Sequence, residues 1–105
     1  MSLQELTRTY RHRWAAVRRW KEPDQGDTLT FLASEAAELI KAVCEVQIQA
    51  GGYTRNNPDK IHTMAGVTEE IAGVVLMSCI LCDQLGLELE TVYQDYLEAM
   101  DRKRL

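Results

Sequence analysis

The sequence predicts an all-α protein built from four helices. Its two prolines, Pro23 and Pro58, both fall in apparent connections, which leaves long segments free to form helix. Apolar residues recur at spacings of three and four, the period of an amphipathic helix, and no segment alternates as a half-buried strand would. The length of 105 residues is that of one domain, so we expect a single domain over residues 1–105.

The first helix is expected from Ser2 to about Trp20. Its apolar stripe consists of Leu3, Leu6, Tyr10, Trp14, Val17 and Trp20. The opposite arc is basic and carries Arg8, Arg11, His12, Arg18 and Arg19. A solvated face is the plain interpretation of this arc. Nucleic-acid binding is not expected, because no recognition motif follows and the net charge of the chain is −4.

A turn over residues 21–26 contains proline and glycine and precedes a second helix. Asp27 or Thr28 is expected to cap this helix, which then runs to about Ala50. Its apolar positions alternate by four and three and predict a seam for packing against another helix: Leu32, Ala36, Leu39, Val43 and Val46.

After a long connection that reaches Gly66, Thr68 is expected to cap a third helix that ends near Leu85. This helix should be the most buried element, because residues 71–82 carry no charge. Gly86 is expected to close it. Cys79 and Cys82 lie inside the apolar run and are interpreted as core residues rather than as a zinc or redox pair.

The fourth helix is expected from about Glu88 to Lys103. One side of it is apolar and carries Leu89, Val92, Tyr93, Tyr96, Leu97 and Met100. Four helices of this kind carry more apolar surface than a lone bundle hides, so we expect a homodimer or homotetramer to complete the bundle. The uncharged run of residues 71–82 is shorter than the roughly 20 residues of a membrane span, and we expect no membrane association. With no apolar leader and three cysteines expected as free thiols, the expected location is the cytoplasm.

Two acidic clusters adjoin the most apolar helical stretches. Glu35 and Glu38 are three residues apart and therefore share one helix face, and Glu69 and Glu70 open the third helix. Carboxylates from two neighbouring helices would make an oxygen-rich site suited to Mg²⁺. Each cluster also has an ordinary interpretation: an exposed ladder with Lys41 in the first case, and acids that complement the helix dipole in the second.

These clusters give the chain its resemblance to a known family. From about Trp14 onward the sequence resembles the MazG-like, all-α nucleoside triphosphate pyrophosphohydrolases, whose signature is Glu-Glu-x-x-Glu on one helix and Glu-x-x-Asp on a later one. The matching segments are Ser34-Glu35-Ala36-Ala37-Glu38 with flanks Arg19-Trp20-Lys21 and Leu39-Ile40-Lys41-Ala42, then Glu70-Ile71-Ala72-Gly73, Leu85-Gly86-Leu87-Glu88-Leu89-Glu90 and the basic tail after Met100.

The resemblance implies Mg²⁺-dependent hydrolysis of a (deoxy)nucleoside triphosphate to the monophosphate and pyrophosphate, of the house-cleaning type. The implied metal ligands are Glu35, Glu38 and Glu70, and the implied catalytic residues are Glu38 and Glu69. The implied substrate-binding residues are Lys41, Trp20, Arg102 and Arg104, and Trp14 is an alternative to Trp20 for stacking on the base.

The chain departs from the family pattern at Gly73, where the last metal-binding aspartate would fall. Three carboxylates remain, which suffice for one Mg²⁺ but hold a second ion less readily. Two alternatives to the enzyme therefore stay open: a catalytically impaired relative that binds nucleotide or metal or regulates a partner, and a purely structural helical oligomer.

Overall fold

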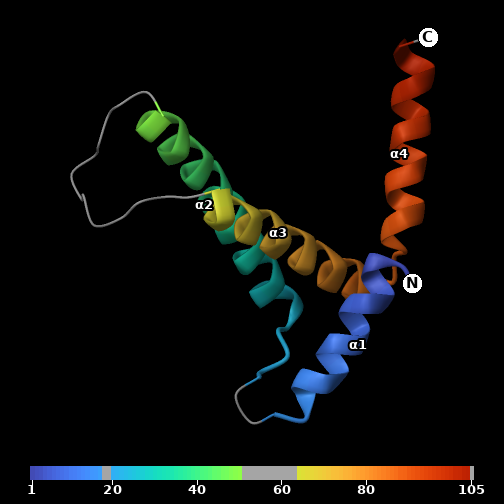
Figure 1. Ribbon diagram of the computed structural model, residues 1–105. Helices are drawn as coiled ribbons and strands as arrows, with labels where there is room; N and C mark the ends of the chain where they lie inside the picture. The colour runs from blue at the N-terminus through green and yellow to red at the C-terminus, as the bar shows by residue number, and fades with distance from the viewer. Residues whose placement is uncertain (18–19, 51–63, 105) are drawn as a thin grey trace.

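The computed structural model describes residues 1–17, 20–50 and 64–104, and all regular structure in these ranges is helical. The four helices are α1 (Leu3–Ala15), α2 (Gln25–Ala50), α3 (Met64–Leu85) and α4 (Leu89–Arg104). The all-α, four-helix prediction is thereby confirmed. Helices α2 and α3 pack along each other, α1 lies against the end of α3 near the N-terminus of the chain, and α4 projects away (Figure 1).

The start of α2 is set by Asp24, three residues before the predicted cap. Asp24 Oδ1 accepts a hydrogen bond from the backbone N–H of Asp27 at 2.7 Å, and Asp27 Oδ2 accepts one in return from the Asp24 N–H at 3.3 Å. This reciprocal pair satisfies two backbone donors that a helix start leaves open. The prediction of Asp27 or Thr28 as the cap was therefore wrong. Thr28 is instead fully buried and donates to the Asp24 carbonyl.

Helix α1 begins as predicted, with the Ser2 hydroxyl accepting from the Glu5 N–H at 3.0 Å. It ends at Ala15, however, and not at Trp20. Beyond the helix, the Val17 N–H donates to the Trp14 carbonyl and the Trp20 N–H donates to the Val17 carbonyl. The rings of Trp14 and Trp20 are in contact, with 4.9 Å between their centroids.

The start of α3 also differs from the prediction. The helix begins at Met64, so Thr68 is not its cap but lies within it and donates to the Ala65 carbonyl. Most of the predicted connection, residues 51–63, lies outside the described residues. At the other end, Gly86 adopts a φ of 70° and closes α3 as predicted, because this left-handed conformation suits glycine.

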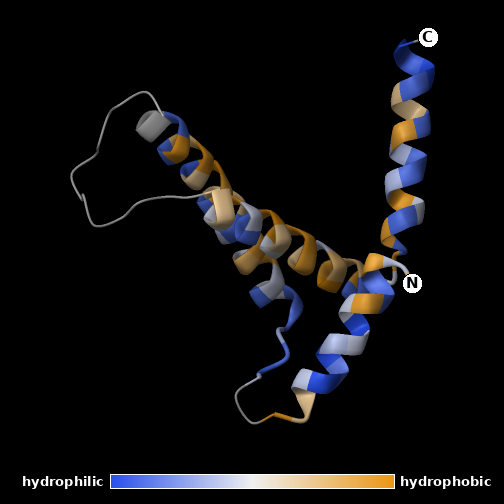
Figure 2. Ribbon diagram, in the orientation of Figure 1, coloured by the Kyte–Doolittle hydropathy of each residue, from blue (hydrophilic) through white to orange (hydrophobic). Residues whose placement is uncertain are grey.

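Helix α3 supplies most of the described core, as predicted. Of the buried apolar residues, Ala42 lies on α2, whereas Val67, Met77, Cys79 and Ile80 lie on α3. Figure 2 shows α3 as the most uniformly hydrophobic helix. By length and composition alone α3 could cross a membrane. Its last turn nevertheless carries Asp83, which pairs with arginines of α1, as in the core helix of a bundle.

The predicted apolar stripe of α1 is not its packed face. Leu3, Leu6 and Tyr10 are exposed, whereas Gln4 is only 2% exposed. The Gln4 amide donates to Asp83 at 2.6 Å and to the Leu87 carbonyl at 2.8 Å, and its oxygen accepts from the Leu89 N–H at 2.7 Å. A polar contact therefore fixes α1 to the α3–α4 junction. The first part of the predicted stripe does not pack, whereas Trp14 and Trp20 are half-buried and line a hollow with Leu76 of α3.

Candidate functional site

The acidic residues predicted on two different helices meet where α2 packs along α3. The Glu70 side chain, half-buried on α3, forms a hydrogen bond with Glu35 of α2, and this bond is the largest cause of a raised pKa at Glu70. Burial and the charges of Glu35, Glu38 and Glu69 raise this pKa further. Two carboxyl groups can share a hydrogen bond only while one of them carries a proton. The site thus holds more negative charge than its own residues neutralise.

Gly73 of α3 lies against the side chain of Glu35. A Cβ atom built on Gly73 would point at the Glu35 carboxyl group, lying 3.0 Å from its Cδ and closer still to Oε2. Because glycine has no side chain, Glu35 can lie against the α3 backbone at this point. The position at which the family pattern expects an aspartate therefore faces the acidic pair.

The other two predicted carboxylates surround the pair without joining it. Glu38 and Glu69 are both exposed, and each acts on Glu70 through its charge. Within the described ranges, no three His, Cys, Asp or Glu side chains adopt an arrangement that could hold a metal ion. The structure thus brings Glu35 and Glu70 into contact and leaves Glu38 and Glu69 at the rim.

The donor set suits a hard divalent cation. Carboxylate oxygens are the ligands Mg²⁺ prefers, and Mg²⁺ usually takes one or two of them together with water and substrate oxygens. A cation between Glu35 and Glu70 would offset the negative charge that raises the Glu70 pKa, and Glu38 follows Glu35 on the same face of α2. The residues present therefore suit one ion that takes two carboxylates and completes its shell with water.

An apolar hollow lies one helical turn farther along α3. It has a volume of about 300 Å³ and is lined by Trp14, Val17, Trp20 and Leu76. Leu76 follows Gly73 by three residues and so occupies the same face of α3, about 4.5 Å along its axis. The Trp20 indole N–H donates to Glu22 at 2.8 Å, which fixes the orientation of that ring. The hollow therefore offers aromatic surface to a flat apolar group.

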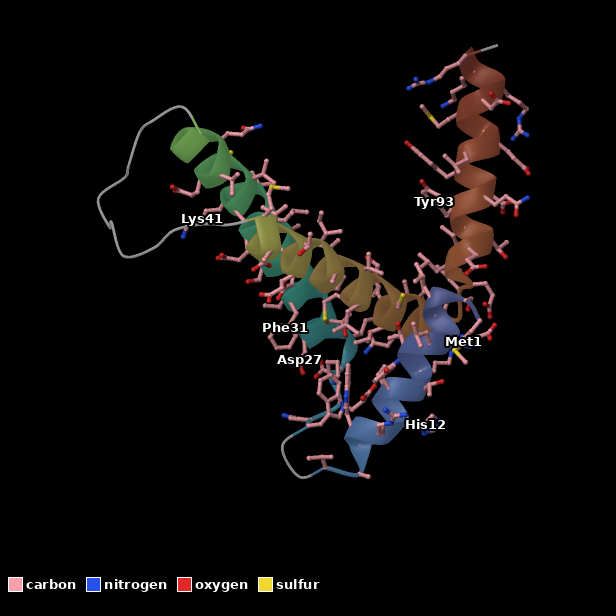
Figure 3. All side chains as sticks on the ribbon, in the orientation of Figure 1. Met1, His12, Asp27, Phe31, Lys41 and Tyr93 are labelled. Carbon is pink, nitrogen blue, oxygen red and sulfur yellow. The ribbon has the colours of Figure 1, made fainter. Side chains whose placement is uncertain are left out.

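The predicted basic substrate-binding residues do not contact the acidic pair. Lys41 is exposed on α2, three residues beyond Glu38 (Figure 3). Arg102 and Arg104 lie at the C-terminal end of α4, which projects away from α2 and α3 (Figure 1). One chain does not bring these two arginines to the acidic pair.

A second polar cluster was missed from the sequence. Asp83 accepts hydrogen bonds from Arg8 at 2.9 Å, Arg11 at 3.0 Å and Gln4 at 2.6 Å. Burial raises the pKa of Asp83, but the hydrogen bonds from Arg8 and Gln4 and the charges of both arginines outweigh it, so the pKa lies below its ordinary value. The sequence did hold a signal for this contact: Asp83 directly follows the uncharged residues 71–82, and the first helix carries a basic arc that could pair with it.

This cluster borders a hollow of about 430 Å³ lined by Arg8, Arg11, His12, Ala15, Glu22 and Asp83. Its arginines are already paired, because Arg11 also contacts Glu22. The plain interpretation of the basic arc of α1 as a solvated face is therefore incomplete. Two of its arginines attach α1 to the end of α3.

Comparison with known proteins adds no relative. No protein-family model matches the chain, and no curated protein and no solved structure matches it either.

Proposed function

We propose that this chain is a Mg²⁺-dependent nucleotide pyrophosphohydrolase that cleaves a (deoxy)nucleoside triphosphate into the monophosphate and pyrophosphate. The observation that carries the proposal is the approach of Glu35 of α2 to α3, where its carboxyl group lies against Gly73 and raises the pKa of Glu70. A divalent cation bound between the two carboxylates would offset the repulsion of their charges.

In this proposal Glu35, Glu38 and Glu70 hold Mg²⁺. Bound there, the ion would offset the negative charge of the phosphates. Glu38 and Glu69 line the exposed rim, where either carboxylate can orient the attacking water and accept its proton. Lys41 is on the same helix as Glu35 and supplies positive charge for the phosphate chain.

The base is proposed to lie in the hollow between Trp14, Trp20 and Leu76. Aromatic rings stack on nucleobases regardless of base identity, and two of the side chains that line the hollow are tryptophans. Arg102 and Arg104 would reach such a substrate only from a second copy of the chain.

The test is release of pyrophosphate from a panel of canonical and damaged nucleoside triphosphates in the presence of Mg²⁺. We expect turnover of at least one nucleotide, abolished by Glu38→Gln and retained by Glu98→Gln, a matched change on the exposed surface of α4. Equal turnover by the two variants would contradict the proposal.

Gly73 favours a second function, that of an impaired relative that binds a metal–nucleotide complex without hydrolysing it. The glycine removes the carboxylate that would complete the site, and it does so at the position that faces Glu35. Thermal stabilisation by nucleotide and Mg²⁺ together, with no pyrophosphate released, would identify this function.

A further inference from the structure

Helix α4 meets the rest of the described chain at its start, where the Leu89 N–H donates to Gln4, and projects away beyond it (Figure 1). None of its residues is buried, and Tyr93 and Tyr96 are 62% and 60% exposed. Figure 3 shows Tyr93 on a helix that stands well apart from α2 and α3. An exposed apolar stripe of this length on a protein helix marks an interaction surface.

The dimensions of the chain agree with an incomplete bundle. The radius of gyration is 17.2 Å, whereas a compact domain of this length has about 13 Å. Helix α4 extends beyond the end of α3 (Figure 1). The molecule therefore has the shape of one part of a larger assembly.

We propose that α4 is a dimerisation helix that pairs antiparallel with α4 of a second copy of this chain. The seam of the pair consists of Leu89, Tyr93, Tyr96 and Met100, whose spacings of four, three and four are those of helix-packing positions. Val92 and Leu97 flank the seam and widen it.

The charges of α4 favour a second α4 as its partner and favour an antiparallel orientation of the two helices. The helix begins with Glu90 and ends with Arg102, Lys103 and Arg104. Glu90 and Arg104 are exposed and are separated by close to four whole turns, so they lie on the same flank of the seam. In an antiparallel two-fold pair each Glu90 meets Arg104 of the other copy, whereas a parallel pair sets like charges side by side. The helix is thus complementary to itself, and Leu97, midway between the two, lies near the two-fold axis.

The apolar seam is tested by sedimentation equilibrium of the full chain. We expect a dimer for the wild-type chain and a monomer for Tyr93→Ser/Tyr96→Ser. The matched control, Thr91→Ser/Gln94→Ser, changes the opposite face and should stay dimeric. Circular dichroism should show equal helix content for both double variants, since all four side chains are exposed in one chain. A wild-type monomer, or a dimer that survives the tyrosine changes, would overturn the proposal.

The orientation is tested by exchanging charges. Glu90→Arg alone and Arg104→Glu alone should each raise the dimer Kd about tenfold, because each creates two repulsive pairs in a symmetric dimer. The double variant should restore the Kd to within about threefold of wild type. Arg102→Glu, on the opposite face at the same helix end, should leave the Kd unchanged and controls for the helix dipole. A double variant weaker than either single one, or a wild-type chain that floats with lipid vesicles instead of dimerising, would contradict this arrangement.

Discussion

Glu35 on α2 lies over Gly73 on α3, with its carboxyl group in the space a side chain at position 73 would occupy. This relationship connects the packing of the two helices to the chemistry of the site. The missing Cβ lets Glu35 reach Glu70, and the same missing side chain removes a fourth carboxylate.

Replacing Gly73 with aspartate should make the fold more dependent on Mg²⁺. Without metal, Gly73→Asp should melt at a lower temperature than Gly73→Asn, because it adds a further negative charge beside Glu35 and Glu70. With Mg²⁺ the order should reverse, since the new carboxylate joins the ligands. Tm measured with and without Mg²⁺ for both variants tests this. The same Mg²⁺ response in both would mean that position 73 does not take part.

The Asp83 cluster should contribute strongly to stability. Asp83→Asn should lower the free energy of unfolding by about 2–3 kcal/mol, because Asp83 and Arg11 are both mostly buried and Arg11 would lose one of its two carboxylate partners. Asp95→Asn on exposed α4 should change the same quantity by less than about 0.5 kcal/mol. Urea denaturation of the two variants measures both. Equal changes in the free energy of unfolding would show that the Asp83 cluster contributes no more to stability than an exposed carboxylate.

The same carboxylate predicts an acid dependence. Its pKa in the folded chain lies below the ordinary aspartate value of about 3.9, so folding favours its charged form. The stability it adds is fully present above about pH 4 and is lost as the pH falls through the lower folded-state pKa. The difference in unfolding free energy between wild type and Asp83→Asn should therefore be constant from about pH 5 to 7 and shrink below about pH 4. A difference that grows on acidification would contradict the assignment.

Gln4 should act as the fastening point of α1. Gln4→Ala removes three hydrogen bonds and leaves the Leu87 carbonyl and the Leu89 N–H without this partner, which should cost about 2–3 kcal/mol. Gln94→Ala, an exposed glutamine with one hydrogen bond, should cost less than about 1 kcal/mol. Hydrogen exchange should locate the loss of protection in α1 and at the start of α4.

Helical periodicity predicted the four helices because each has a long apolar or amphipathic pattern, and the end of α3 was predicted because Gly86 permits a positive φ. The starts of α2 and α3 were misplaced, since Asp24 competes with Asp27 for the cap and the chain before Thr68 is already helical. Spacing alone cannot separate such candidates.

The face of α1 was misjudged for a different reason. Helical period alone cannot tell whether α1 packs through its apolar stripe or through the face that carries Gln4. The choice depends on Asp83, some eighty residues away in sequence, which needs Gln4 and Arg8 as partners. The acidic pair was predictable in composition, but its contact depends on the register of α2 against α3.

The most direct test of the central hypothesis, that carboxylates of α2 and α3 share one divalent cation, is a calorimetric titration of the full chain with Mg²⁺. We predict saturable binding by the wild-type chain, loss of that binding in Glu35→Gln, and its retention in Glu98→Gln. Binding of equal strength by Glu35→Gln, or no binding by the wild-type chain, would contradict it.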